Sequence, residues 1–353
     1  MSKSKINDNE IIIQNDISSH FFTYKSHNFQ SNEINTLSLG GGGYYGILNI
    51  ALIRHLEDLD EIKNIKYIYS VSVGTLFGLL IILGFTSEEC IDLILNDLAL
   101  DKLVEIQPQN IFHLIDKLGI NDGSYLETTI KNTLQNRGFS PYVTFKELYE
   151  ATNIEFNVGV SFVFKKNFEL INYKTYPDMP IWLALRASTS IPLVFQPLYD
   201  TEHKDYLCDG GILCNNPIKY ALLNTININN EKYNEKYNEK YNENDSSINT
   251  PPLQFPLMKY KCNVISTDFK LFVNSCNNEN KPSLIQYITA ISRKIFVNQS
   301  SYDERFQKLI YEFEMNDYPE INYTNLKLNK PTLKTIINRG YKELETFFEN
   351  IKN

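Results

Sequence analysis

Cysteine, histidine and basic charge are all scarce in this chain. Its 353 residues include five cysteines, which are scattered and form no C-x-x-C pair. That pattern excludes a disulfide framework and a cysteine zinc site. The 34 Lys and Arg residues are outnumbered by 42 Asp and Glu residues, so the net charge is -8. Nucleic-acid phosphates require clustered positive charge, and we therefore expect no nucleic-acid partner.

Long apolar runs are missing as well. The longest, LFGLLIILGF at residues 76–85, has ten residues, whereas a helix needs about 20 apolar residues to span a bilayer. We expect this run to form a buried core helix. The N-terminal MSKSKINDNEIIIQNDISSH has an apolar run of only three residues, too short for a secretory signal peptide. These features predict a soluble protein of the cytoplasm or another intracellular compartment.

Strand, glycine turn and helix follow one another twice near the start of the chain. Residues 34–39 (INTLSL) are a predicted strand that leads into Gly40–Gly46 and the helical pattern ILNIALIRHLEDL. Residues 65–69 are a second predicted strand, followed by SVSVG and the apolar helix. This repetition predicts an α/β fold with parallel strands. Further strands are expected at residues 154–164, 168–173 and 259–266, and helices after Ser87 and Thr144 and over residues 284–297 and 332–351.

Composition divides the chain into four parts. Residues 1–35 are a polar N-terminal extension, and residues 36–222 carry the dense motifs of one α/β domain. Residues 223–253 are a low-complexity insert with three Lys-Tyr-Asn-Glu units, and such polar repeats cannot bury a core. We predict that this insert is disordered. Residues 254–353 supply a strand and helices that complete the domain.

Ser72 is the first candidate catalytic residue. It lies between a predicted strand and a predicted helix, in Ser70-Val71-Ser72-Val73-Gly74. A serine in a strand–turn–helix is typical of a nucleophile elbow, G-x-S-x-G, where the helix N-terminus favours a developing anion. Ser70 stands at the first glycine of that pattern. A serine in this place can also simply cap the helix.

The glycine loop offers backbone N–H groups to an anion. Gly40-Gly41-Gly42-Gly43 between strand and helix suits either a phosphate cradle or an oxyanion hole. The run from Gly41 to Gly46 fits the dinucleotide pattern G-x-G-x-x-G, but the second strand ends at Ser70 without the acidic residue that this interpretation requires. A purely structural glycine turn is the remaining alternative.

Asp209 is the candidate partner of Ser72. It begins Asp209-Gly210-Gly211, and Asp-Gly is also a common turn dipeptide. All five histidines lie at or before residue 203. The order Ser…Asp…His of α/β-hydrolases therefore cannot be completed with Asp209 as the acid. If Ser72 is a nucleophile, its base is either a carboxylate directly or a histidine in an unusual order, and Asp209 acting directly as the base is the economical solution.

Taken together, these motifs resemble the patatin-like phospholipase family. That family has a glycine-rich oxyanion loop, a G-x-S-x-G serine and a D-G-G or D-G-A aspartate, in the order found here. Residues 186–197 resemble the family's R-A-S-x-x-x-P-x-x-F-x-P block, and residues 215–217 resemble its N-N-P motif. The resemblance covers about residues 36–220. Two positions depart from it: Ser70 replaces glycine, and Tyr45 stands where the family often has Arg or Lys.

The resemblance implies a three-layer α/β/α sandwich with a central, mainly parallel sheet. It also implies hydrolysis of fatty-acyl esters of phospholipids or other lipids, without metal or cofactor. The substrate would lie in a lipid or membrane interface, and peripheral membrane contact is compatible with this; the oligomeric state stays open. The implied roles are nucleophile and base for Ser72 and Asp209, oxyanion hole for Gly41, Gly42, Gly43 and Gly46, and motif support for Ser70, Gly74, Gly210, Gly211 and Arg186.

Two alternatives remain at this point. The same dyad serves an acyltransferase or thioesterase, and a catalytically degenerate member would bind lipid or a partner without turnover. Ser70 and Tyr45 favour degeneracy, whereas intact Ser72 and Asp209 oppose it. Arg186 either orients the active-site loops or forms a structural ion pair. The aromatic segments Phe21-Phe22 and 162–168 are candidates for lipid contact, although aromatic strands more often belong to the core.

Overall fold

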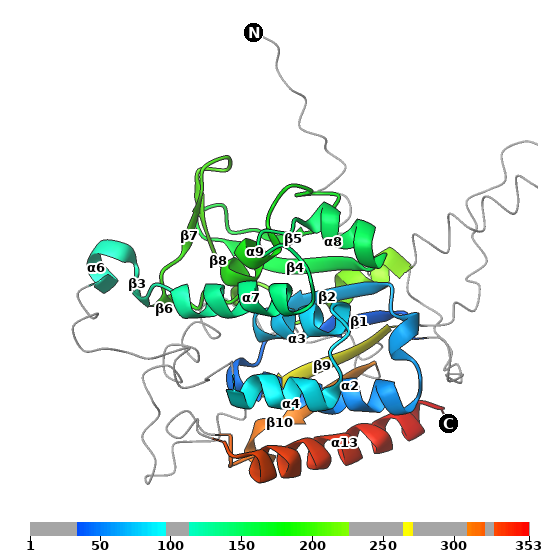
Figure 1. The fold of residues 1–353 in the computed structure, drawn as a ribbon. Helices are drawn as coiled ribbons and strands as arrows, with labels where there is room; N and C mark the ends of the chain where they lie inside the picture. The colour runs from blue at the N-terminus through cyan, green and yellow to red at the C-terminus, as the bar shows by residue number, and fades with distance from the viewer. Residues whose placement is uncertain (1–33, 97–112, 226–263, 271–308, 322–327, 353) are drawn as a thin grey trace, which may run out of the picture.

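The centre of the molecule is an eight-stranded sheet (Figure 1). The computed structural model describes residues 34–96, 113–225, 264–270, 309–321 and 328–352. The strand order is β10-β9-β1-β2-β4-β8-β7, with β5 also paired to β4. The strands are β1 (Thr36–Leu39), β2 (Tyr67–Val71), β4 (Glu155–Phe162), β5 (Phe168–Ile171), β7 (Leu198–Asp200), β8 (Asp205–Asp209), β9 (Val264–Lys270) and β10 (Ile310–Glu314). Two short strands, β3 (Gly119–Asn121) and β6 (Leu193–Phe195), form a separate parallel pair.

The sheet is mixed. The pairs β10–β9, β9–β1, β1–β2 and β2–β4 are parallel, whereas β4–β5, β4–β8 and β7–β8 are antiparallel. Short turns join β4 to β5 and β7 to β8, and short turns can only connect antiparallel neighbours. The predicted α/β fold is confirmed, and the parallel half is the half built from strand–helix repeats.

Side-chain caps mark the starts of two of the helices, α8 and α4. The helices are α2 (Asn49–Asp58), α3 (Val73–Ile82), α4 (Ser87–Asn96), α6 (His113–Lys117), α7 (Ser124–Asn136), α8 (Phe145–Thr152), α9 (Ile181–Ser188) and α13 (Lys330–Lys352), with 3-10 turns η1 (Gly43–Leu48), η2 (Ile62–Asn64), η4 (Gly210–Ile212) and η5 (Met315–Asp317). The predicted start at Thr144 is confirmed, because Thr144 and Glu147 form a reciprocal capping box. At α4 the equivalent exchange joins Thr86 and Glu89, one residue before the predicted start signal.

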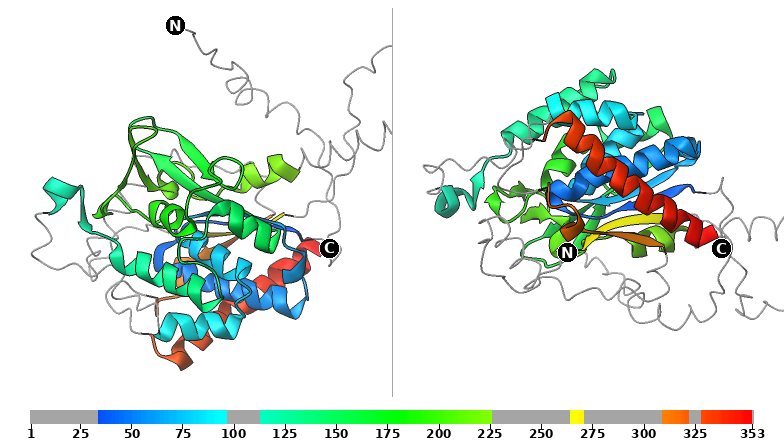
Figure 2. Two further views of the ribbon diagram at one scale, coloured as in Figure 1. Left: turned by 45° about the horizontal axis from the view of Figure 1, so that its top comes forward. Right: turned by 90° about the horizontal axis from the view of Figure 1, so that it is seen from below.

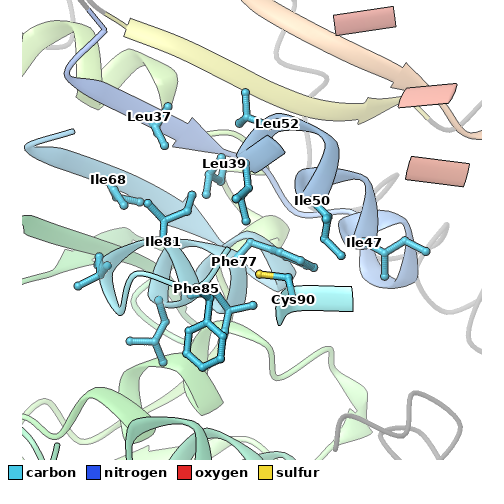
Figure 3. Close-up of a cluster of buried hydrophobic side chains, with 14 of the residues drawn as sticks. Leu37, Leu39, Ile47, Ile50, Leu52, Ile68, Phe77, Ile81, Phe85 and Cys90 are labelled. Atoms are coloured by element: carbon cyan, nitrogen blue, oxygen red, sulfur yellow. The ribbon is translucent and has the colours of Figure 1, made fainter. Parts of the chain in front are cut away.

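Two hydrophobic clusters lie on the two faces of the sheet. Successive residues of β2 alternate between them: Ile68 belongs to the large cluster and Tyr69 to the small one. The large cluster packs β1 and β2 against α2, α3 and α4 (Figure 3). The small cluster includes Ile218, Ala221 and Leu222, from the helical residues 218–225, together with Val264 and Ile310. Helices therefore cover both faces, which gives the three layers of the predicted sandwich.

The apolar run at residues 76–85 lies in α3 and just beyond it, and its side chains are mainly buried, as predicted. Within the described ranges no helix is both long and apolar enough to cross a membrane. Seen from below, α13 lies beside α2 (Figure 2). It contains the predicted helix 332–351.

Some predicted elements lie partly or wholly outside the described residues. The strand expected at residues 259–266 is found at Val264–Lys270, and residues 259–263 lie outside the described part. The expected helix 284–297, the Lys-Tyr-Asn-Glu insert and the N-terminal extension also lie outside it. The division into four parts and its three boundaries stay predictions.

Candidate active site

Ser72 alone makes the sharp turn between a strand and a helix. β2 ends at Val71 and α3 begins at Val73, and Ser72 has φ 53° and ψ -130°. A residue with a side chain is strained there by about 1–3 kcal/mol. The turn brings Gly74 against β1, where a Cβ atom would lie 2.4 Å from the Leu39 carbonyl oxygen. The strand–turn–helix geometry predicted around Ser72 is thus present.

The register of β4 brings Ser72 and Asp209 together. Val71, at the end of β2, pairs with Gly159, and Asp209, at the end of β8, pairs with Val160. β5 pairs with these same residues of β4 and must occupy its other edge. Hence β2 and β8 approach each other end to end along one edge of β4. Their meeting point places the Ser72 hydroxyl beside the Asp209 carboxylate.

The contact between the two side chains is direct. The Ser72 Oγ hydroxyl donates to Asp209 Oδ2 at 2.6 Å. The other carboxylate oxygen accepts the Gly211 N–H at 2.7 Å, and the Asp209 N–H donates to the Ser190 carbonyl at 2.9 Å. Both members of the pair are buried, with 8% and 5% of their surfaces exposed. Asp209 is therefore held with one oxygen aimed at Ser72.

The glycine loop lies against Ser72, but its glycines have different tasks. A Cβ on Gly41 would come within 3.0 Å of Ser72 Cβ. However, the Gly41 N–H donates to the Asn215 carbonyl at 3.0 Å. The prediction that Gly41 supplies an oxyanion donor is therefore wrong for this geometry, because its N–H is already bonded. Gly46 lies inside η1, where a Cβ would meet Val73 Cγ2 at 2.3 Å, so it permits packing instead.

Free donors remain at Gly42 and Gly43. Both precede the first hydrogen bond of η1, from Tyr45 N–H to the Gly42 carbonyl, and within the described residues neither N–H has an acceptor. At the start of α3 the Val73 N–H likewise lies ahead of the first helical bond, from Thr75 to Ser72. Val73 directly follows Ser72 in the chain, and Gly42 and Gly43 follow Gly41, the glycine whose Cβ would contact Ser72. Sequence reasoning missed Val73, although the first helix residue after an elbow serine is a regular donor.

Asn215 and Asp268 clamp the glycine loop. Besides accepting from Gly41, Asn215 donates its side-chain amide to the Gly41 carbonyl at 2.9 Å and to Asp268 Oδ1 at 2.8 Å. The same Asp268 oxygen accepts the Phe269 N–H at 2.8 Å. The Asn-Asn-Pro motif pointed to Asn215 without giving it a role. Nothing in the sequence indicated Asp268, which comes from β9, far along the chain.

Ser188 and Arg186 support the dyad from α9. Ser188 Oγ accepts the Ser72 N–H at 2.9 Å and donates to the Gly159 carbonyl at 2.6 Å. The buried Arg186 guanidinium donates to Ser190 Oγ and to the carbonyls of Asp122 and Gln196. Arg186 makes no ion pair within the described residues, so the structural ion-pair alternative is not found there. Burial lowers its pKa to about 10, and it stays charged at neutral pH.

The two departures from the motif are accommodated. Ser70 is fully buried in β2, where its hydroxyl faces the Asn157 carbonyl at 3.4 Å, and the elbow still forms beyond it. Tyr45 is buried in η1, and burial raises its pKa, so it brings no charge to the loop.

Burial also raises the pKa of Cys208, next to Asp209, to about 12. Its neutral thiol offers no competing nucleophile.

Within the described part of the chain, no group of three or more His, Cys, Asp or Glu side chains is arranged to hold a metal ion. The chemistry that these side chains can perform is proton transfer from a serine to an aspartate. Backbone donors lie next to that serine, and the positive end of α3 points toward it. This arrangement suits nucleophilic attack on a carbonyl carbon.

Comparisons with known proteins agree on one family. Residues 37–222, more than half of the chain, match the family model "Patatin-like phospholipase". Uncharacterized protein R571 of Acanthamoeba polyphaga mimivirus is 27% identical over 188 residues, which are 53% of this chain and 61% of the relative. Probable lipid hydrolase 463L of Invertebrate iridescent virus 6 is 25% identical over 189 residues, covering 53% and 63%. The chain thus matches only about three fifths of the length of these relatives.

Among solved structures, VipD from Legionella pneumophila aligns with a TM-score of 0.47 and 14% identity. The alignment covers 90% of this chain and 67% of VipD. The family-model match spans the glycine loop, the elbow, the Arg-Ala-Ser block and the Asp-Gly-Gly turn, in the order that the sequence motifs predicted. This chain belongs to the patatin-like phospholipase family.

Proposed function

We propose that this chain hydrolyses fatty-acyl esters of phospholipids or other lipids with Ser72 as nucleophile and Asp209 as base. The observation that carries the proposal is the 2.6 Å hydrogen bond from Ser72 Oγ to Asp209 Oδ2 at a strained strand–helix turn. Membership of a phospholipase family and a relative named as a probable lipid hydrolase support lipid esters as the substrate class.

The first half of the reaction forms an acyl-enzyme. Ser72 Oγ attacks the ester carbonyl carbon while its proton passes to Asp209 Oδ2. The carbonyl oxygen becomes an anion that accepts N–H groups from Gly42, Gly43 and Val73. When the tetrahedral intermediate collapses, the bond to the alcohol oxygen breaks, and the proton on Asp209 passes to the leaving alcohol. Each preorganised donor of this kind lowers the activation barrier by about 3 kcal/mol.

The second half releases the fatty acid. Asp209 takes a proton from water, whose oxygen attacks the acyl carbon, and the same donors hold the second oxyanion. Collapse breaks the bond to Ser72 Oγ, which recovers its proton from Asp209. The Gly211 N–H holds the Asp209 carboxylate through both steps, and the Ser190 carbonyl holds the Asp209 backbone N–H. No group other than serine, aspartate, backbone and water is required.

Substitution of either dyad residue tests the mechanism. We expect Ser72→Ala and Asp209→Asn to lower kcat for p-nitrophenyl butyrate and for phospholipid vesicles by about 10⁴-fold or more. Ser124→Ala, at an exposed position on α7, is the matched control and retains full turnover. A fluorophosphonate probe should label wild type at Ser72 and leave Ser72→Ala unlabelled. Unchanged turnover in either purified dyad variant would refute the assignment.

A further inference from the structure

A cluster of exposed aromatic side chains lies at one end of β4 and β8. Phe164 is 74% exposed, Tyr199 is 53% exposed, and Val163 is 42% exposed. Tyr206 joins them, with its ring 6.3 Å from Phe164 and 5.0 Å from Tyr199 between centroids. We call these four residues the aromatic tip. Large apolar side chains that gather in water instead of the core mark a surface that binds something.

Buried hydrogen bonds hold the aromatic tip outward. Asp205, which is 1% exposed, accepts the N–H groups of Phe164 and Lys165, at 3.0 and 2.8 Å. These bonds fix the turn that follows β4. Tyr199 and Tyr206 face each other as a cross-strand pair of the β7–β8 hairpin, which projects beyond the rest of the fold (Figure 1). The rings are therefore presented on an ordered support and need little reorganisation before they bind.

The exposed charges beside the aromatic tip are mainly positive, whereas the nearby Asp200, Asp205 and Glu169 are partly or fully buried. The net charge of the chain is -8, yet the exposed charged side chains beside the aromatic tip are Lys165, Lys166, Lys204 and Glu202. Asp200 is half-buried and pairs with His203 at 2.7 Å. Three exposed lysines against one exposed glutamate complement the phosphate groups of phospholipids. Aromatic rings flanked by lysine are also the side chains that settle at a membrane–water interface.

The aromatic tip and the dyad share a strand. On β8, Asp209 lies three residues after Tyr206, which is a distance of about 10 Å at about 3.3 Å per residue. We propose that the aromatic tip is the surface by which this chain docks on a phospholipid bilayer. The choice of a bilayer as partner rests on the proposed function, whereas the surface itself is defined by its exposure and charge. Docking there would hold the lipid interface close to Asp209 and therefore close to its hydrogen-bond partner Ser72.

Vesicle sedimentation tests the proposal. We expect the full-length chain to sediment with phosphatidylcholine vesicles that contain one fifth phosphatidylserine. The double variant Phe164→Ser/Tyr199→Ser should bind about 100-fold more weakly, since one buried ring contributes about tenfold. Tyr142→Ser, which removes another exposed aromatic ring outside the aromatic tip, is the control and keeps wild-type binding. Circular dichroism melting confirms that both variants are folded.

Ser72→Ala separates this proposal from the proposed function. It should sediment like wild type while hydrolysing nothing. If wild type hydrolyses vesicles but the double variant sediments equally well, the aromatic tip is not the docking surface and the function stands. If wild type sediments through the aromatic tip but turns over no ester, the docking surface stands and the function fails. A double variant that turns a dimer into a monomer without changing vesicle binding would also overturn the proposal.

Discussion

Glycine at position 72 should give a more stable protein than alanine at position 72. Both substitutions remove the hydroxyl and its 2.6 Å bond to Asp209, so that loss cancels in the comparison. They differ in the Cβ atom, which is strained at φ 53° and ψ -130° by about 1–3 kcal/mol. Glycine loses about 0.5–1 kcal/mol through the greater freedom of its unfolded chain. The balance favours Ser72→Gly by about 1 kcal/mol.

Urea unfolding followed by circular dichroism measures this difference, and thermal melting should show Ser72→Gly about 2 °C above Ser72→Ala. The pair Ser124→Gly and Ser124→Ala is the control. Ser124 begins α7 and is not among the residues with positive φ, so glycine should be the less stable replacement there. If Ser72→Ala is as stable as Ser72→Gly, the elbow stores no strain and the reasoning is refuted.

Two more predictions concern buried carboxylates. Burial acts to raise the pKa of Asp205, but the N–H groups that it accepts from Phe164, Lys165 and Tyr206 lower it below its ordinary value. A depressed pKa contributes stability above about pH 4 that is lost as the pH falls through the folded-state value. The difference in unfolding free energy between wild type and Asp205→Asn should therefore shrink from pH 7 to pH 3, and a constant difference would contradict this.

Asp268 holds the glycine loop through Asn215, and its loss should displace the N–H donors of that loop. Asp268→Ala should therefore lower kcat for p-nitrophenyl butyrate by about 10- to 100-fold with little change in KM, since a displacement of about 1 Å is enough to cost such a factor. Asp268→Asn keeps an oxygen for the Asn215 amide and should restore most of the turnover. Equal kcat in both variants would argue against a positioning role.

Much of the fold followed from local patterns. Two strand–glycine–helix repeats predicted the parallel half of the sheet, and the Thr144 capping box predicted the start of α8. The antiparallel half was harder, because the short strands β7 and β8 carry no clear alternation. Their place is decided by pairing with β4, which involves residues distant in the sequence. The exposed aromatic tip was not separable from core strands for the same reason: burial depends on which strand lies alongside.

The sequence by itself determined the order of the motifs, and the absence of histidine after residue 203 favoured Asp209 over a histidine as the base for Ser72. Only the tertiary structure decided their contact, because β2 and β8 meet end to end on one edge of β4. It also decided which glycines keep a free N–H. Gly41 is bonded to Asn215, and Asp268 enters from β9 through the parallel pairing of β9 with β1. Residues far apart in the chain supply these hydrogen-bond partners, so a single stretch of sequence does not record them.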